Sequence, residues 1–438
     1  MIIQIKSDNP NLSYMLAKNP DSGLQGEPLR KGVLFHYFAN PQHYIVYFED
    51  NCDSVNISYP KINSKGEYLD RTSYMSSHAM FDILSTLFNH CLKPEVHERY
   101  SSYANPENAY TYSLQCILEV QGEHNLDIFK KYCESDFGKV NFQYKKFHRH
   151  VYDIVLTSHD LFNLIKIAFI FAVYNSIYNK DKMYLHTSFV TKVVEILNVL
   201  DAPFFIRYLI KKNMIFNRKV YDTIKEKLQS STRYKIKFVS QNSPWEIRYN
   251  YVYNHINTTV PVLIDWGFGE GKLLYRMRKM FDVVIGVEID DAMLERLNWR
   301  IDNKEDHKGI ICIDAKDSSQ LHKLEGLVKD KQCAIVLSEV IEHLETIHEC
   351  KSFLSYLLDK YTPVQILITT PNREFNKYLS IDTLRHEDHK FELDKEQLIN
   401  LISSVLEGRN YKFELKGIGD IVNEEPMWFG VNVFKDKE

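Results

Sequence analysis

The sequence has no C-x-x-C pair, no H-E-x-x-H motif and no internal repeat. Its seven cysteines are odd in number and scattered along 438 residues, which favours reduced thiols over a disulfide framework. The missing thiolate pair and the missing H-E-x-x-H helix argue against a zinc protease. The formal net charge of −4 is nearly neutral, so any surface that binds nucleic acid must be a local basic patch.

The sequence also lacks a segment that would place the chain in a membrane. The longest apolar stretch, residues 161–178, is interrupted by Asn163, Lys166 and Asn175, which predicts a buried helix and no membrane partner. The first ten residues, MIIQIKSDNP, lack the apolar core of a signal peptide. We therefore expect a cytoplasmic protein.

Different patterns divide the chain into three parts. Residues 1–150 mix short alternating runs with a helical pattern over Met75–Leu92, which predicts an α+β region. Residues 151–235 are almost wholly helical in pattern and are expected to belong to the same half. The polar stretch Gln229–Pro244 predicts a boundary, after which residues 236–438 form a separate domain. The strands expected in the first part are Ile2–Ile5, Val33–Tyr37, His43–Phe48, Ser54–Tyr59 and Tyr110–Leu118.

Strands and helices alternate through residues 236–438. This alternation is typical of βαβ units and predicts an open, mostly parallel sheet with helices on both faces. The last two strands, Lys412–Gly417 and Met427–Phe434, are expected to form a hairpin. The predicted fold class is therefore α/β, with a Rossmann-like C-terminal domain after an α+β region that ends in a helical segment.

A glycine-rich turn follows the first strand of the C-terminal domain. Val262–Leu274 has the sequence VLIDWGFGEGKLL, in which an apolar strand, Asp265 and three glycines precede a helix. The spacing of Gly267, Gly269 and Gly271 differs from the G-x-G-x-x-G of dinucleotide sites. Glycines here would let the backbone approach a ligand, although a tight turn without a ligand has the same pattern.

The ends of the next two strands add specificity to this turn. Val283–Val287 is followed by Glu288, which is placed to accept hydrogen bonds from two ribose hydroxyls. Ile310–Ile313 is followed by Asp314 and Ala315, where an adenine amino group would be recognised. The combination resembles the S-adenosylmethionine pocket of class I methyltransferases more than a dinucleotide site.

Three metal-binding side chains follow a later apolar strand, in the stretch CAIVLSEVIEH. They are Glu339, Glu342 and His343, and on a helix beginning near Val340 they would share one face at the carboxyl end of the strand. With His389 from a later loop they would make a four-ligand site for a divalent metal. A solvated helix start, with acidic residues favoured by the helix dipole, is the alternative.

Three blocks of sequence carry a resemblance to a known family. They are S-E-V-I-E-H, then T-P-N-R-E-F-N at residues 370–376, then D-H-K-F-E at residues 388–392. Together they resemble the family of small-RNA methyltransferases, which 2′-O-methylate the 3′-terminal ribose of RNA. The resemblance implies that one set of residues holds the metal and carries the catalysis: Glu339, Glu342, His343 and His389.

The resemblance also implies the reaction. S-adenosylmethionine would donate its methyl group to the 2′-hydroxyl of the terminal ribose. That hydroxyl is a very weak acid, and a divalent cation would stabilise its alkoxide. Two carboxylates and two imidazoles favour Mn²⁺, with Co²⁺ and Mg²⁺ as alternatives. Holding the 2′ and 3′ hydroxyls together would select a free RNA 3′ end.

Two further sets of residues complete the predicted site. The expected RNA contacts are Thr370, Pro371 and Asn372. The expected cofactor contacts are Asp265, Gly267, Gly269, Gly271, Glu288, Asp314, Ala315 and Ser338.

Two features of the last block leave alternatives open. His386 lies three residues before His389 and is a rival ligand if that loop is helical. The family usually has Trp-Thr-Arg after D-H-[KR]-F-E, whereas this chain has Leu393-Asp394-Lys395. The departure concerns recognition of the RNA end near this loop and does not affect the metal ligands.

The N-terminal half carries a second resemblance. Asn11–Asp21 and Tyr68–Leu87 resemble the corresponding half of the bacterial branch of the same family. In that branch this half joins a polynucleotide kinase-phosphatase-ligase and stimulates RNA ligation during RNA repair, so we expect such a partner. Basic clusters with aromatic neighbours at Tyr144–His150 and Arg207–Lys219 would contact RNA or an acidic partner, unless they are solvated surface.

Two other functions fit part of the sequence. A methyltransferase acting on a small-molecule hydroxyl would explain the glycine-rich turn, but not T-P-N-R-E-F-N together with D-H-K-F-E. A non-enzymatic activator of the ligase would explain the N-terminal half, but not the intact set of metal-binding side chains.

Overall fold

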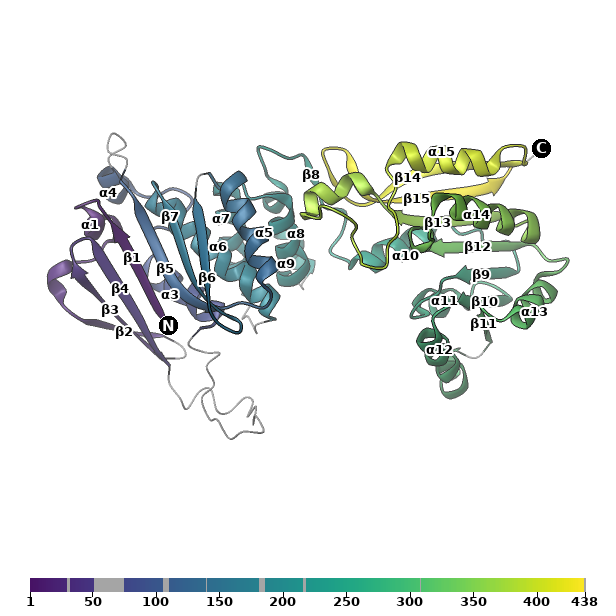
Figure 1. Cartoon of the computed structure of the whole chain (residues 1–438), viewed down its shortest axis with the longest axis horizontal. Helices are drawn as coiled ribbons and strands as arrows, with labels where there is room; N and C mark the ends of the chain where they lie inside the picture. Colours follow the sequence, from purple (N-terminus) through teal and green to yellow (C-terminus); the bar gives the residue numbers. More distant parts are fainter. Residues whose placement is uncertain are drawn as a thin grey trace. The chain divides into compact units, whose positions relative to one another are not determined.

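The computed structural model describes residues 1–29, 32–50, 75–104, 110–138, 140–180, 186–215, 218–307 and 309–436. The strand expected at Ser54–Tyr59 and the start of the Tyr68–Leu87 block lie outside these residues. Contacts divide the chain into two compact units, Met1–Arg233 and Tyr234–Glu438, each with its own sheet (Figure 1).

The N-terminal unit is built on a seven-stranded antiparallel sheet, in the order β2-β3-β4-β1-β5-β7-β6. The expected α+β character of this part is confirmed. The last strand of this sheet along the chain, β7, lies beyond residue 150. The strands are β1 (Ile2–Ser7), β2 (Gln25–Leu29), β3 (Gly32–Asn40), β4 (His43–Asp50), β5 (Tyr112–Glu119), β6 (Asn141–His148) and β7 (Val151–Ser158).

Helices cover the face of this sheet onto which alternate strand residues point. In β5 every second side chain, from Tyr112 to Leu118, is buried, which gives one apolar face. The helices are α1 (Leu12–Leu16), α3 (Ser77–Leu87), α4 (Glu98–Ser101), α5 (Glu123–Ser135), α6 (Leu161–Asn179), α7 (Thr187–Val199), α8 (Phe204–Met214) and α9 (Arg218–Gln229).

Helix α6 is the central helix of this unit. Asp160 caps it by accepting from the backbone N–H groups of Phe162 and Asn163. The helix is long and apolar enough to cross a membrane, but 83% of its most apolar window is buried inside the unit. The apolar stretch predicted to be a buried helix is therefore a core helix.

The C-terminal unit confirms the predicted Rossmann-like sheet. Its eight strands have the order β11-β10-β9-β12-β13-β15-β14-β8, in which the first five are parallel and the last three antiparallel. The strand order reverses between β9 and β12, where such folds bind ligands. The strands are β8 (Ile236–Lys237), β9 (Val262–Trp266), β10 (Val283–Glu288), β11 (Ile310–Asp314), β12 (Cys333–Ser338), β13 (Gln365–Pro371), β14 (Tyr411–Val422) and β15 (Glu425–Lys435).

Helices lie on both faces of this sheet (Figure 1). Helices α13, α14 and α15 pack on one face, where their apolar side chains join those of the central strands in one core. The predicted hairpin of β14 and β15 is confirmed and extends the sheet. The helices are α10 (Pro244–His255), α11 (Lys272–Met277), α12 (Asp291–Asn303), α13 (Ser318–Val328), α14 (Ile347–Tyr361) and α15 (Lys395–Leu406).

The helix expected from Val340 is wrong. After β12 the backbone N–H of Glu339 still donates to Thr369 O on the neighbouring strand, at 2.9 Å, and Glu339 then turns with φ of 58°. A short 3₁₀ turn spans Ile341–His343, and α14 begins only at Ile347, where Thr346 caps it. The residues after β12 are therefore brought together by a tight loop and not by one face of a helix.

Helix α10 packs closely on β15, because Gly430 of β15 has no side chain at the point of contact. A Cβ atom at Gly430 would lie 2.5 Å from Tyr251 Cε1 and 2.6 Å from Ile418 Cδ1. We expect Gly430→Ala to destabilise the protein by about 1–3 kcal/mol through overpacking. Thermal unfolding would check this as a melting temperature lowered by several degrees.

The control for this substitution is Gly326→Ala in helix α13, where an added Cβ meets no atom within 4 Å. It should stabilise the helix by about 1 kcal/mol. Equal melting temperatures for the Gly430 variant and the wild type would contradict the packing described.

Candidate active site

The glycine-rich turn links the end of β9 to helix α11. Gly267, Gly269 and Gly271 all have positive φ, at 77°, 51° and 70°. A Cβ at Gly267 would lie 2.7 Å from Val340 Cγ2, whereas one at Gly269 would meet no atom within 4 Å. The turn therefore touches the loop after β12 on one side and is open on the other.

Glu288 connects this turn to the end of β10. Its Oε2 accepts from Gly269 N–H at 2.8 Å, and its Oε1 accepts from the N–H groups of Ile289 and Asp290. The backbone of Ala315 donates in turn to Glu288 O at 2.8 Å. These bonds bring the ends of β9, β10 and β11 into one rigid edge, where the predicted cofactor residues lie side by side.

Asp265 is the polar group that points to a ligand at this edge. Its side chain is 2% exposed, and its Oδ2 has no hydrogen-bond partner among the described residues. Burial, together with the nearby charge of Glu288, raises the pKa of Asp265 to about 7. An unpartnered buried carboxylate beside an open glycine turn fits a ligand with a cationic or N–H donor group, as S-adenosylmethionine has.

Ser338 and Trp266, at the ends of the two central strands, are held within the protein. Ser338 Oγ lies 3.0 Å from Thr369 Oγ1 on the neighbouring strand. The Trp266 ring packs against Phe353 and Tyr361 of helix α14, on the core side of the sheet. The Trp266 ring therefore packs against the core of the unit.

Three of the four predicted metal ligands meet in space. Ligand atoms of Glu342, His343 and His389 all lie within 4.8 Å of one another. Glu342 is 1% exposed, and Thr370 Oγ1 donates to its Oε2 at 3.1 Å, while its Oε1 has no partner among the described residues. The rings of His343 and His389 are 4.9 Å apart and perpendicular.

Glu339 lies beside this group without belonging to it. One carboxylate oxygen accepts from Thr369 Oγ1 at 3.3 Å, and the other lies 3.5 Å from Arg248 Nε. The φ of 58° at Glu339 sets this direction. In this arrangement Arg248 on α10 is the counter-ion of Glu339. The role of Glu339 as a metal ligand stays a prediction.

The electrostatics of the group are those of buried like charges. Burial and the charge of Glu339 raise the pKa of Glu342 well above its ordinary value. Burial raises the pKa of Glu339 as well, against the opposing effect of Arg248. Burial and the neighbouring His389 lower the pKa of His343. Two carboxylates beside two imidazoles are a donor set that a divalent cation would stabilise.

Glu392 orients His389 and was not among the predicted site residues. His389 Nδ1 donates to Glu392 Oε1 at 2.6 Å, and Asn376 Nδ2 donates to Glu392 Oε2 at 2.5 Å. Although burial opposes ionisation of Glu392, these hydrogen bonds lower its pKa. A carboxylate on one ring nitrogen leaves the other nitrogen, Nε2, for a metal. The signal was present in the sequence, because Glu392 ends the D-H-K-F-E block.

Arg385 joins the two later motif blocks. Its backbone N–H donates to Glu392 Oε1 at 2.8 Å, its Nε donates to Asn376 Oδ1 at 2.6 Å, and its guanidinium also donates to Asn372 O. Arg385 and Arg248 both lie over the ring of Trp428, at 5.8 and 5.0 Å. No local sequence pattern marks Arg248 or Trp428, because each reaches the site from an element far away in the chain.

The predicted RNA contacts are buried in this structure. Thr370 bonds to Glu342, and Asn372 donates to Pro426 O at 2.9 Å while its side-chain oxygen accepts from Glu374 N–H. Pro371 is the last residue of β13 and is also buried. Thr370 thus holds Glu342 in place, and a direct contact of Thr370, Pro371 or Asn372 with RNA stays a prediction.

The alternatives at the last block can now be placed. The side chain of His386 is 64% exposed, pairs with Asp388 at 3.3 Å and does not belong to the group of Glu342, His343 and His389. Leu393 is buried, and its backbone oxygen accepts from Arg373 N–H at 3.1 Å. Asp394 caps helix α15 by accepting from Gln397 N–H. The departure Leu393-Asp394-Lys395 thus starts a helix.

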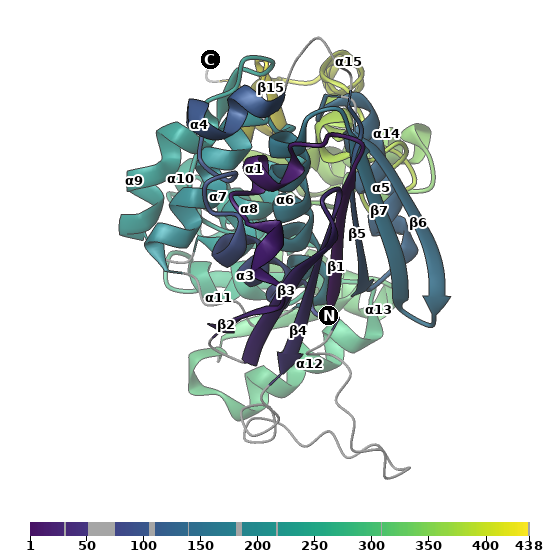
Figure 2. The ribbon, with the colours of Figure 1, turned by 90° about the vertical axis from the view of Figure 1, so that its left-hand side faces the viewer.

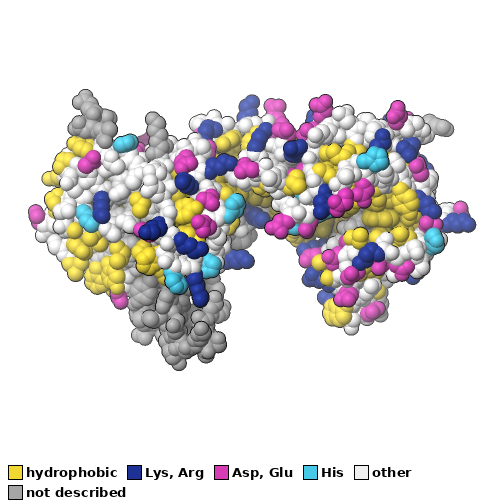
Figure 3. Space-filling model, viewed as in Figure 1, with side chains coloured by type: hydrophobic (Ala, Val, Ile, Leu, Met, Phe, Trp, Pro, Cys, Tyr) yellow, Lys and Arg dark blue, Asp and Glu magenta, His cyan; other side chains and the backbone are white. Residues whose placement is uncertain are grey.

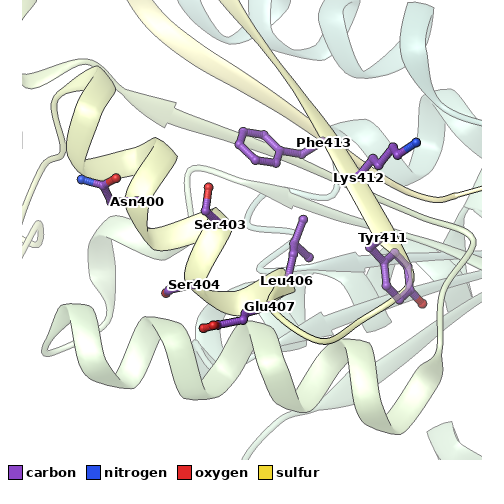
Figure 4. A pocket seen from close by; sticks show the side chains of 8 residues that line it. All are labelled: Asn400, Ser403, Ser404, Leu406, Glu407, Tyr411, Lys412 and Phe413. Atoms are coloured by element: carbon purple, nitrogen blue, oxygen red, sulfur yellow. The ribbon is translucent and has the colours of Figure 1, made fainter.

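A cavity of about 720 Å³ lies elsewhere in this unit, between α15 and β14 (Figure 4). Leu406, Tyr411 and Phe413 give it an apolar wall, and Ser403 and Glu407 give it polar groups. None of the predicted site residues lines it, so we assign it no part in the chemistry.

The N-terminal unit decides the family. The family model for the Hen1 N-terminal domain matches residues 2–233, which is more than half of the chain. The chain belongs to the Hen1 family.

Curated relatives match a smaller part of this Hen1-family chain. The small RNA 2′-O-methyltransferase of Xenopus tropicalis is 29% identical over 187 residues, 40% of this chain and 49% of that protein. The enzyme of the same name from Arabidopsis thaliana is 29% identical over 200 residues, 41% of this chain and 21% of that protein. The chain thus spans about half, or less, of the length of these relatives.

A solved structure shares the fold along the whole Hen1-family chain. It is a chain of a Pnkp1/Rnl/Hen1 complex, with a TM-score of 0.77 and 21% identity. The superposition covers the full length of both chains. A second structure, of the Pnkp1/Rnl/Hen1 RNA repair complex, has a TM-score of 0.76, with 99% of this chain covered. At this identity the likeness establishes the fold alone.

The raised pKa of Asp265 makes stability depend on pH. Burial destabilises the ionised form of Asp265. The folded chain is therefore most stable below pH about 4, where this group is protonated, and it loses that stability as the pH rises from about 4 through about 7. We expect Asp265→Asn to raise the melting temperature of the ligand-free Hen1-family chain by several degrees at pH 8 and by less than half as much at pH 5. The same variant should bind S-adenosylmethionine more weakly.

Asp302→Asn is the matched control for Asp265→Asn, because Asp302 is exposed on helix α12. It should leave both melting curves unchanged. If Asp265→Asn stabilised the chain more at pH 5 than at pH 8, the raised pKa of Asp265 would be contradicted.

The hydrogen bond from His389 to Glu392 predicts an effect on metal affinity. Glu392→Ala frees the imidazole to rotate and should weaken Mn²⁺ binding by about 10- to 100-fold. Titration of the Hen1-family chain with Mn²⁺, followed by the paramagnetic resonance of the free ion, measures this without any turnover.

Glu387→Ala removes the same charge from an exposed position of the same loop and should leave Mn²⁺ affinity unchanged. If both variants bound Mn²⁺ as tightly as the wild type, Glu392 would have no positioning role.

Proposed function

We propose that the chain transfers the methyl group of S-adenosylmethionine to the 2′-hydroxyl of the 3′-terminal ribose of RNA, with a divalent metal. The observation that carries this proposal is the convergence of Glu342, His343 and His389 after β12, next to the glycine-rich turn. The contact between Val340 and Gly267 joins the two parts of the site. The names of the curated relatives, small RNA 2′-O-methyltransferase, support the same reaction and the same class of substrate.

The cofactor would occupy the edge formed by β9, β10 and β11. Asp265 would accept from its cationic amino group, which fits the unpartnered Oδ2. Glu288 would bind the ribose hydroxyls with the acceptor capacity that its backbone bonds leave on Oε2. Asp314 and Ala315 would contact the adenine, and the open side of Gly269 leaves room for the ligand.

Glu342, His343 and His389 would hold the metal, with Glu339 as the fourth ligand. When bound, a divalent cation supplies the charge that makes a ribose hydroxyl acidic and that aligns the 2′ and 3′ oxygens. Burial of Glu342, Thr369 and Thr370 keeps water away from this side of the site. Thr370 and Glu392 orient Glu342 and His389 before any ligand arrives, so little reorganisation is left for the reaction.

The metal we favour is Mn²⁺. Two imidazoles next to carboxylates suit a borderline cation better than Mg²⁺, which prefers oxygen ligands and retained water. Co²⁺ should support the reaction as well.

We also infer a place in bacterial RNA repair. Residues 1–150 and the helical residues 151–235 would bind and activate a polynucleotide kinase-phosphatase-ligase, and residues 236–438 would methylate the RNA end, in the cytoplasm. The match of residues 2–233 to the Hen1 N-terminal domain supports this. So does the shared fold with a chain from a Pnkp1/Rnl/Hen1 RNA repair complex.

The reaction is tested with the full chain, labelled S-adenosylmethionine and one RNA that ends in either 2′,3′-hydroxyls or a 3′-phosphate. We expect label only in the hydroxyl-ended RNA, with Mn²⁺ more effective than Mg²⁺. Glu342→Ala and His389→Ala should each lower the rate by about 100-fold or more, because each removes a metal ligand.

His386→Ala is the matched control, since it removes an exposed imidazole three residues away. It should keep most of the activity. Full turnover by His389→Ala, or equal labelling of the 3′-phosphate RNA, would contradict the proposal.

A further inference from the structure

Strand β6 and its turn form a basic edge on the N-terminal sheet. β6 is the last strand of that sheet, and Figure 2 shows it at the free edge. Residues 145–150, K-K-F-H-R-H, are all exposed. We call residues 145–150 the basic hairpin; Lys and Arg side chains gather on the face that carries it (Figure 3).

The cations of the basic hairpin lack acidic partners. None of Lys145, Lys146 and Arg149 forms an ion pair with any residue that the structure describes. Lys145 lies opposite Asp153, but both oxygens of that carboxylate accept from Gln115 Nε2, at 2.9 and 3.0 Å. Two further acids nearby, Asp127 and Glu123, accept from the hydroxyls of Tyr144 and Tyr152. The three cations are therefore not engaged in direct ion pairs with the described residues and remain available to a ligand.

Several other cations of the same unit do form ion pairs. Lys227 lies 3.1 Å from Glu195, Lys18 lies 3.5 Å from Glu27, and Lys130 lies 3.9 Å from an acid one helical turn away. These paired cations provide a comparison for those of the hairpin.

Phe147 lies in the middle of these cations. It is 74% exposed, more than any other large apolar side chain in the described parts of the chain. The pairing of β6 with β7 shifts register between Lys146 and His148, so Phe147 occupies a bulge. Bulges redirect a side chain out of the regular pleat. Lysines alone would protect a sheet edge from aggregation, but an exposed phenylalanine would not.

We propose that the basic hairpin binds single-stranded RNA. Lys145, Lys146 and Arg149 would contact backbone phosphates, and a base would stack on the ring of Phe147. Exposed cations that form no ion pairs, around an exposed aromatic ring, are the combination that binds single strands without sequence preference. An acidic protein surface would use the charges but would not need the bulged ring between them.

This site is separate from the methyl-transfer site and needs neither metal nor cofactor. Its test therefore uses the full chain in chelator, with a fluorescent single-stranded RNA that ends in a 3′-phosphate. Fluorescence anisotropy is measured over a series of salt concentrations. A failure here would say nothing about the methyltransferase, and a failed methylation assay would say nothing about this site.

The test variant carries Lys145→Gln, Lys146→Gln and Arg149→Gln. We expect at least about tenfold weaker binding at low salt, and a slope of log K against log salt that is smaller by about 2, since each lost phosphate contact removes about 0.7. The matched control carries Lys18→Gln, Lys130→Gln and Lys227→Gln, which remove the same charge from paired cations. It should bind within about twofold of the wild type.

A second variant separates stacking from charge. Phe147→Ala should weaken binding by about 5- to 100-fold without changing the salt slope, and Phe147→Tyr should restore it. Because the ring is exposed, neither change should alter the melting temperature. If the triple hairpin variant bound RNA with the same affinity and the same salt slope as the control, the proposal would be overturned. The hairpin would then bind an acidic protein or remain solvated surface.

Discussion

The C-terminal unit depends on two carboxylates that lie close together at the end of one strand, of which Glu342 is buried and Glu339 is partly exposed. Glu339 and Glu342 are within reach of each other's charge, and one arginine, Arg248, lies against the pair. Buried like charges destabilise a fold unless a cation or a proton compensates them. The neighbouring imidazoles of His343 and His389 cannot do this while they are neutral. A divalent cation would compensate both carboxylates and would use both rings.

The fold holds this group in place from three sides. Glu339 has a left-handed backbone conformation, which costs of order 1–3 kcal/mol and persists because the surrounding strands impose it. Val340 packs against Gly267, so the loop after β12 and the glycine-rich turn are in direct contact. Glu392, anchored by Asn376, holds His389 from the opposite side. The two sites that a methyl transfer needs are thus coupled through direct contacts.

The sequence predicted the parallel sheet and the motif blocks because both depend on local pattern. Apolar strands, the glycine spacing and the acidic residues after β12 are all readable in short windows. The helix at Val340 was wrong because tertiary contacts, the Thr369 hydrogen bond and the packing on Gly267, override helix spacing there. Arg248 and Trp428 were missed because they are distant in the chain. Strand β6 was missed because, as an edge strand, it buries only Phe142 fully and lacks alternation.

The central claim is that a cation belongs between Glu342, His343 and His389. A crystal of the protein grown with Mn²⁺ and measured on both sides of the manganese absorption edge tests this most directly. We predict one strong anomalous peak bounded by these three side chains, with Glu339 turned away from Arg248 to meet it. A peak elsewhere in the unit, or none at this position with Glu342 still bonded only to Thr370, would contradict it.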